Sequence, residues 1–269
     1  MKKLFYILTG TLLFLSMQPV HGQMKSSIGD SEYAFARTAE RDGIKRAFES
    51  YMAPHGYIVV GHHITNALAY YSGVPNDTTD LLWWRPNRVF ANNDNDFGFA
   101  TGPFRYFRTR HGNAVAAGHT FSIWEKNKDG IYKILFDGGV NLATIPSDSL
   151  HDLERNPIIQ LNFNTQSSWQ MSVEAEGDFP GSNKVHKNAV FLRPNKGFML
   201  NWELAEAVQK MVKKPMQEGF DRTGKTFYRF GNLGKDETSL KEGKFCGYFA
   251  QVWSRHKNEW VLIADVMQY

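Results

Sequence analysis

The sequence predicts an α+β protein built from two similar halves in tandem. In the first half, helical periodicity comes first and a run of strand-like segments follows, which is typical of helices packed on one face of a curved antiparallel sheet. Landmark residues then recur 129 positions later (231−102, 247−118 and 253−124), in the same setting of turn glycine, alternating strand, Trp, polar hairpin and apolar strand. A repeat this long indicates duplicated domains, since solenoid repeats span on the order of 20–50 residues. The matching pairs are Gly102 and Gly231, Gly118 and Gly247, and Trp124 and Trp253.

Residues 1–22 have the pattern of a secretory signal peptide. A basic start precedes the largely apolar run 4–17, and Gly22 is a small residue before a cleavage point at Gln23. The run is too short and too interrupted to span a bilayer. Cys246 is the sole cysteine, which excludes a lipid-modified cysteine at the cleavage point. We expect an exported protein, periplasmic or extracellular, without a membrane anchor.

Charge and cysteine content narrow the class of protein. The formal net charge of +4 falls to +2 on cleavage, because two lysines leave and no acid does (29 basic minus 27 acidic residues). So small a charge gives no basis for a nucleic-acid partner. One cysteine cannot form an intramolecular disulfide, so the domains depend on core packing. The aromatic content of 14% suits cores or pockets lined with rings.

The elements of the first half follow from periodicity and punctuation. A helix begins at Asp30 or Ser31, runs to Met52 and ends before Pro54, because its apolar residues recur at three- and four-residue spacing. After Pro86 the alternation changes to period two, with polar turns at 92–96 and 126–130. The other predicted elements are a buried strand at 57–60, a short helix at 64–71, and strands at 88–91, 97–100, 104–109, 119–124 and 132–136.

The second half is less regular at its start. Residues 141–164 are rich in Pro, Asp and Ser and form the connection, with a short helix at 150–154. A strand at 189–192, a helix capped by Asn201 and a sheet over 224–267 then repeat the order of the first half. The predicted organisation is a signal peptide at 1–22, a first domain at 30–143, a linker at 144–164 and a second domain at 165–269.

Four segments resemble a known superfamily. Residues 84–91 (WRPNRVFA), 96–103 (DFGFATGP), 118–126 (GHTFSIWEK) and 129–137 (DGIYKILFD) are similar to the sheet half of secreted SnoaL-like, ketosteroid-isomerase-like proteins, which share the fold of nuclear transport factor two. The resemblance covers Glu32 to Gly139 and, in the second half, residues 190–194 and 228–267. It implies two tandem cone-shaped domains, each a curved antiparallel sheet wrapped on N-terminal helices, with an apolar pocket. The superfamily includes isomerases, dehydratases, epoxide hydrolases and many proteins without known chemistry, so the fold does not choose among them.

His119 and Asp137 are the candidate acid and base. His119 alternates with Phe121 and Ile123 on one strand face, and its ordinary pKa suits proton transfer near neutral pH. Asp137 ends the next strand, where burial among rings would raise its pKa. Because the turn at 126–130 makes the two strands neighbours, we predict that both side chains enter one cavity. The alternative is a core histidine with its hydrogen bonds satisfied and an aspartate that caps a turn or pairs with an arginine.

A ligand pocket would draw on aromatic residues of the first half, although such residues more often fill a core. No metal or cofactor is predicted. The adjacent His62 and His63 point to opposite faces of a strand, and the polar loop at 92–96 has Phe97 and Pro103 where a calcium loop needs Gly and Glu. The candidate lining residues are His62, Tyr70, Trp84, Phe99, Phe121 and Trp124.

Three functions remain open. The first is binding of a small apolar molecule in the pocket of the first domain, without established catalysis. The second is an isomerase, dehydratase or hydrolase that uses His119 and Asp137. The third is a scaffold in which the two domains pair as an intramolecular pseudo-dimer, and a homodimer of the whole chain is also possible. Convergent polar groups in one pocket would favour the enzyme, and an all-apolar pocket would favour the binding protein.

Overall fold

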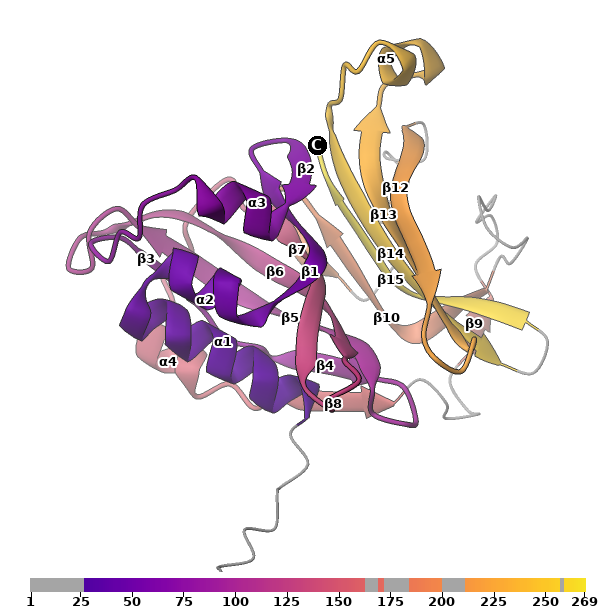
Figure 1. Ribbon diagram of the computed structural model, residues 1–269, viewed down its shortest axis with the longest axis horizontal. Coiled ribbons are helices and arrows are strands. Elements are labelled where there is room, and N and C mark those ends of the chain that lie inside the picture. Colours follow the sequence, from indigo (N-terminus) through magenta and orange to yellow (C-terminus); the bar gives the residue numbers. More distant parts are fainter. Residues whose placement is uncertain (1–26, 163–168, 172–183, 200–210, 257–258) are drawn as a thin grey trace, which may run out of the picture.

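The computed structural model describes residues 27–162, 169–171, 184–199, 211–256 and 259–269 (Figure 1). The predicted opening helix is two helices, because Gly43 at φ 96° separates them. The predicted helix at 150–154 is confirmed, whereas the one at 64–71 begins only at Ala67. The helix predicted after Asn201 lies outside the described residues. The described helices are α1 (Ile28–Asp42), α2 (Ile44–Tyr51), α3 (Ala67–Ser72), α4 (Leu150–Glu154) and α5 (Glu237–Lys241).

The first sheet has the strand order β2-β1-β7-β6-β5-β4-β8, and β3 also pairs with β5. Its pairs are antiparallel except β1 with β7 and β4 with β8, so the predicted antiparallel sheet is in fact mixed. Strand β8 comes from the segment predicted as a linker. The strands are β1 (Met52–Val60), β2 (His63–Asn66), β3 (Leu81–Trp84), β4 (Arg88–Ala91), β5 (Phe97–Phe107), β6 (Ala114–Lys126), β7 (Tyr132–Asn141) and β8 (Ile159–Asn162).

The second sheet has the order β11-β10-β15-β14-β13-β12, and β9 also pairs with β10. Here too the first long strand, β10, runs parallel to the last, β15, and the other pairs are antiparallel. The chain is therefore α+β with two mixed sheets and few helices. The strands are β9 (Trp169–Met171), β10 (Lys184–Arg193), β11 (Gly197–Met199), β12 (Val212–Phe220), β13 (Thr226–Gly234), β14 (Gly247–His256) and β15 (Glu259–Gln268).

The two sheets have the same register at matching positions. Gly102 of β5 lies opposite Thr120, and Gly231 of β13 lies opposite Phe249. A Cβ atom added at Gly102 would lie 1.8 Å from the Arg85 carbonyl oxygen, and one at Gly231 would lie 2.1 Å from the Lys214 carbonyl oxygen. Only glycine permits this close approach. The strand that contains each Trp, β6 or β14, also has the same one-residue register shift against its neighbour, directly before the Trp.

The two faces of the first sheet pack against different partners. Helices α1 and α2 cover one face, and the second sheet lies against the other (Figure 1). Phe35, Trp84 and Trp124 belong to the helix-side core, whereas Phe121 and Phe230 belong to the core between the sheets. None of the helices in the described ranges is long and apolar enough to cross a membrane.

Polar contacts also join the sheets. Asn92 Nδ2 donates a hydrogen bond to Asp221 Oδ2 at 2.9 Å, and both residues are buried. The Tyr248 hydroxyl accepts a hydrogen bond from the Gly139 backbone N–H at 2.7 Å and donates one to the Gly139 carbonyl. Asn92 and Asp221 are themselves 129 positions apart (221−92), the spacing of the sequence repeat.

Candidate functional site

Helix α1 carries a carboxylate on its buried face. Glu32 lies on the same side of the helix as Phe35 and Ala36, which pack against the first sheet. The start of the helix is fixed by a capping box: the Ser27 hydroxyl accepts the Asp30 N–H at 3.1 Å, and the Asp30 carboxylate accepts the Ser27 N–H at 3.0 Å. Glu32 is therefore held one turn inside a well-defined helix end.

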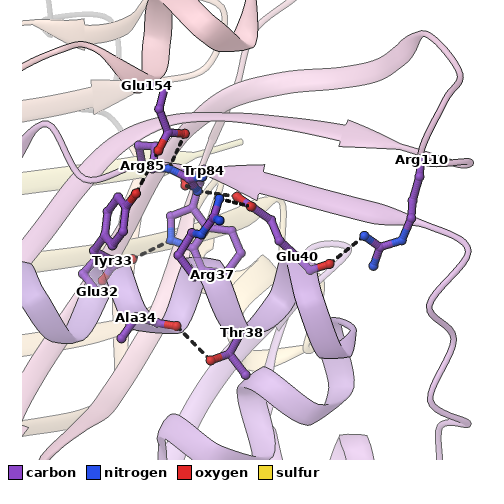
Figure 2. Close-up of polar contacts among 10 residues, drawn as sticks. All are labelled: Glu32, Tyr33, Ala34, Arg37, Thr38, Glu40, Trp84, Arg85, Arg110 and Glu154. Carbon is purple, nitrogen blue, oxygen red and sulfur yellow. Dashed lines mark hydrogen bonds and ion pairs between the residues drawn. The ribbon is translucent and has the colours of Figure 1, made fainter.

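Two indole groups hold the Glu32 carboxylate. Trp84 Nε1 on β3 donates to Oε1 at 2.7 Å, and Trp124 Nε1 on β6 donates to Oε2 at 2.6 Å. Figure 2 shows Glu32 facing Trp84 from α1. Only 1% of Glu32 is exposed. Burial raises the pKa of Glu32, even though the hydrogen bonds from the two indoles act to lower it.

A second carboxyl, Asp137, lies close to the first. Ser122 and Asp137 are paired across β6 and β7, and Ser122 Oγ donates to Asp137 Oδ2 at 2.7 Å. Burial raises the pKa of Asp137 well above its ordinary value, the charge of Glu32 raises it further, and the bond from Ser122 opposes both. Ser122 also acts to lower the pKa of Glu32, which indicates that its hydroxyl lies near both carboxyls.

The raised pKa values of Glu32 and Asp137 favour a proton on this pair. Two interacting carboxyls with raised pKa values titrate together, so the proton belongs to the pair. A protonated carboxyl in apolar surroundings can donate a hydrogen bond to a ligand oxygen or transfer its proton. As a whole residue Asp137 is less enclosed than Glu32, which is only 1% exposed.

Arg85 forms a separate cluster beside α1 (Figure 2). Its guanidinium pairs with Glu40 of α1 and, at 2.7 Å, with Glu154 of α4. The Tyr33 hydroxyl donates to Glu154 at 2.9 Å, and the guanidinium lies 5.1 Å from the Tyr33 ring centre and 4.9 Å from that of Trp83. Since each of the three charges has a partner, the cluster fastens α1 to α4 and leaves no group free for chemistry.

The structure does not bring His119 and Asp137 together. His119 lies opposite Val140, whereas Asp137 lies opposite Ser122. His119 and Ser122 are three residues apart on β6, and an odd step places side chains on opposite faces of a strand. His119 therefore faces the second half of the chain, and Asp137 faces the helices.

A one-residue bulge is the reason. The ladder between β6 and β7 shifts by one residue after Ile123, which leaves Leu135 without a partner. With no shift, Asp137 would lie opposite Phe121, on the same face as His119. A bulge reverses the faces of all the residues that follow it. The predicted pairing of these two residues in one cavity therefore does not occur.

The other predicted lining residues are dispersed. Trp84 and Trp124 contact Glu32 as described above. Phe99 and Phe121 lie in the core between the sheets with ring centres 5.0 Å apart, Tyr70 is 37% exposed on α3, and His62 is exposed in the turn between β1 and β2. In the ranges that the structure describes, no three His, Cys, Asp or Glu side chains gather as a metal site requires.

The second sheet has a matching carboxylate with a cation beside it. Asp265 lies opposite Gln251, whose Nε2 donates to Asp265 Oδ1 at 2.7 Å. Arg193 forms an ion pair with Asp265 and donates to its backbone carbonyl at 2.7 Å. Burial acts to raise the pKa of Asp265, but the charge of Arg193 and the hydrogen bonds outweigh it and hold the pKa below its ordinary value. This carboxylate is paired and ionised.

The sequence interpretation missed Glu32 and Ser122. A signal for Glu32 was present, because it shares the three- and four-residue spacing of the apolar stripe at Phe35, Ala36 and Ala39. An acid on the apolar face of a helix must be buried with partners. Ser122 offered no such signal, because its role depends on the bulge.

Comparisons with known proteins return structures alone. No protein-family model and no curated protein matches the chain. A putative ketosteroid isomerase from Shewanella frigidimarina shares 12% identity over 43% of this chain and 96% of that one, with a TM-score of 0.34. A conserved protein from Planctomyces limnophilus shares 14% identity over 43% of this chain and 94% of that one, with a TM-score of 0.33. An NTF-2 like protein of unknown function from Shewanella oneidensis shares 17% identity over 40% of this chain and 88% of that one, with a TM-score of 0.29. At TM-scores this low, the likeness says nothing about activity.

Proposed function

We propose that the protein binds a small, largely apolar molecule in its first half, between helices α1 to α3 and the first sheet. The observation that carries this proposal is a difference in side-chain size at matching register positions. On the helix side of the first sheet, the residues beside Asp137 are small, and their counterparts in the second sheet are large. The pairs are Ala100 and Arg229, Thr120 and Phe249, Ser122 and Gln251, and Gly139 and Met267.

The large residues occupy the corresponding space of the second half. Phe249 and Met267 pack with Leu233, and Arg229 donates to Gln251 at 3.0 Å. In the first half, several apolar residues that pack against the helix-side core stay partly accessible, as side chains around a ligand chamber do. Among them are Val60, Leu68, Val74, Leu82 and Phe104.

The polar end of the proposed chamber selects the ligand. A protonated Asp137 beside Glu32 is a hydrogen-bond donor in apolar surroundings. The best partner is a neutral ligand with one acceptor, such as a carbonyl or hydroxyl oxygen. An anionic ligand would place a further negative charge beside two acidic groups whose pKa values burial already raises, so we expect this chamber to exclude it.

Binding of the uncharged dye N-phenyl-1-naphthylamine tests the proposal. Thr120→Phe places a phenylalanine in the chamber, the residue type that Phe249 has at the matching position of the second sheet. It should weaken dye binding at least about tenfold, or 1.4 kcal/mol. Thr120→Val separates bulk from chemistry, because it removes only the hydroxyl that donates to the Gly102 carbonyl at 3.2 Å, and it should bind the dye normally. Thr238→Phe, at an exposed position of α5, is the matched control. Equal dye affinity in Thr120→Phe and the unaltered protein would contradict the proposal.

A second candidate is an acid–base enzyme centred on Asp137. It is favoured by the two carboxyls with raised pKa values, a feature that clusters at catalytic sites. In this candidate, Glu32 is the acid–base partner of Asp137, the role predicted for His119. Deuterium incorporation next to the carbonyl of hydrophobic ketones, followed by NMR, would detect proton transfer, and Asp137→Asn should abolish it while dye binding persists. Incorporation that is unchanged in Asp137→Asn would exclude this role.

We also propose that the two halves are a tandem duplication paired as an intramolecular pseudo-dimer, with domains at 30–143 and 165–269 and a connection at 144–164. The matching registers support this. So does the contact between Asn92 and Asp221, because a residue near a two-fold axis meets its own equivalent. A homodimer of the whole chain stays a prediction, and sedimentation equilibrium would test it.

Export of the protein is likewise a proposal. It is supported by the basic start, the apolar run and the small residue before Gln23. Mass spectrometry of protein recovered outside the cytoplasm should give a chain that begins at or near Gln23, and a chain that retains Met1 would refute cleavage.

A further inference from the structure

Four polar residues are contiguous on the face of the first sheet that is turned away from the helices. Arg88 of β4 lies opposite Thr101 of β5. His119 of β6 lies opposite Pro103, which sits between Thr101 and Arg105 along β5. Alternation along β5 places Thr101 and Arg105 on one face. Two guanidinium groups, a hydroxyl and an imidazole thus share one stretch of sheet.

Two of these residues are buried, and polar atoms of the cluster lack hydrogen-bond partners. Thr101 is 1% exposed and Arg105 is 3% exposed. Thr101 Oγ1 and His119 Nδ1 are buried without a hydrogen-bond partner, and Arg105 donates to the Phe104 carbonyl at 3.0 Å. Buried polar groups in this condition are costly unless something else satisfies them.

The positive charge is also unbalanced. Among the residues that the structure describes, no carboxylate lies within ion-pair distance of Arg88 or Arg105. Asp148 acts on Arg105 from a distance and is itself exposed. Burial lowers the pKa of both arginines, and burial together with Arg105 and Arg88 lowers the pKa of His119 to about 4. Such a depression indicates cations without a local counter-charge.

The second half of the chain covers this cluster. The Phe198 ring of β11 lies 4.2 Å from the Arg88 guanidinium and 6.5 Å from the His119 ring, measured to the ring centre. A Cβ atom added at Gly197 would lie 2.9 Å from His119 Nδ1, so the first residue of β11 lies directly against the imidazole. Arg88 and His119 remain partly accessible, which leaves a route from solvent.

The matching positions of the second sheet carry no such cluster. They hold Gln217, Phe230, Gly234 and Tyr248, by the same register. Phe230 stacks on Phe136 in the core between the sheets instead. The basic cluster is therefore a feature of the first half alone, and it can take one ligand per chain.

We propose that Arg88, Thr101, Arg105 and His119 form a binding site for a small oxyanion, the carboxylate or phosphate group of a small molecule, at the junction of the two halves. Guanidinium groups match both anions through paired N–H donors. A bound oxyanion would supply the missing counter-charge and acceptors for the arginines and the hydroxyl. The oxyanion site lies on the opposite face of the first sheet from the proposed apolar chamber, so the two sites are separate.

Thermal unfolding and calorimetric titration of the full chain with sodium phosphate and with sodium acetate, at ionic strength held constant with chloride, test the site. We expect the protein to bind one phosphate or acetate anion per chain, saturably and with a rise in Tm, in at least one of the two titrations. Binding of phosphate alone would identify a phosphate group, and binding of acetate would identify a carboxylate. The absence of saturable binding with both salts would overturn the proposal.

Substitutions locate the site. Arg105→Gln and Arg88→Gln should each weaken anion binding at least tenfold, and the partly exposed Arg88 provides the test if Arg105→Gln fails to fold. Arg46→Gln on the exposed side of α2 is the matched control and should bind the anion normally. Neither site variant should change dye binding in the apolar chamber, so failure of one proposal is distinguishable from failure of the other. Equal weakening by Arg46→Gln would show non-specific screening and overturn the assignment.

Discussion

Replacement of Asp137 by Asn should remove a pH dependence from the stability of the fold. The pKa of Asp137 is raised by burial and by Glu32. Above the ordinary Asp pKa of about 3.9, the folded protein therefore binds more protons at this position than the unfolded chain does. The stabilisation is fully present below that pH and is lost as the pH rises through the pKa of the folded state. The free energy of unfolding should thus fall with increasing pH.

The magnitude follows from proton linkage and from the local geometry. One proton contributes a slope of up to about 1.4 kcal/mol per pH unit. Asparagine has the shape of a protonated aspartate, and its Oδ1 can still accept the hydrogen bond that Ser122 now donates at 2.7 Å. Asp137→Asn should therefore lie close to the unaltered protein near pH 4 and become the more stable of the two above pH 7. Some slope should remain, because burial also raises the pKa of Glu32.

Urea denaturation at half-unit steps from pH 4 to pH 8 measures this difference. Asp265→Asn is the matched control at the corresponding position of the second sheet, where the pKa is lowered and Arg193 is the partner. The stabilisation that ionised Asp265 contributes is present above the ordinary Asp pKa and is lost as the pH falls through the pKa of the folded state. Asp265→Asn should therefore lower the free energy of unfolding by about 3–5 kcal/mol at pH 7 and by less at low pH. Parallel pH profiles for Asp137→Asn and the unaltered protein would refute a buried, protonated Asp137.

Two further substitutions probe the contact between the sheets. Asn92→Asp places a second carboxylate beside Asp221 and should lower the free energy of unfolding by at least about 1.5–3 kcal/mol, because a buried hydrogen bond to a charged group is lost. The double variant Asn92→Asp, Asp221→Asn reverses donor and acceptor and should recover most of the loss in urea denaturation; no recovery would contradict this contact. Tyr248→Phe strands the N–H and carbonyl of Gly139 and should cost about 2–4 kcal/mol, whereas Tyr70→Phe on the exposed side of α3 should be neutral in the same assay. Similar stability of the two Tyr variants would refute the role of the buried hydroxyl.

The sequence by itself determined the local structure and the spacing between the halves. Alternation marked the cores of the strands from Arg88 to Phe136, the glycine of the turn at 126–130 marked the hairpin, and the common spacing placed Trp124 and Trp253 on matching strands. These are short-range properties, because a strand's pattern and a turn's chemistry are set by residues a few positions apart.

Only the tertiary structure decided which residues meet. Alternation shows that His119 and Phe121 share a face, but it does not say what covers that face, and the covering segment is more than 60 residues away in β10, β11 and the later strands. The unpaired Leu135 turned Asp137 toward Glu32, because a strand repeats every two residues and one extra residue exchanges its faces. Bulges depend on the competition between packing on both sides of the sheet, so the candidate site emerged only when helices and both sheets were in place.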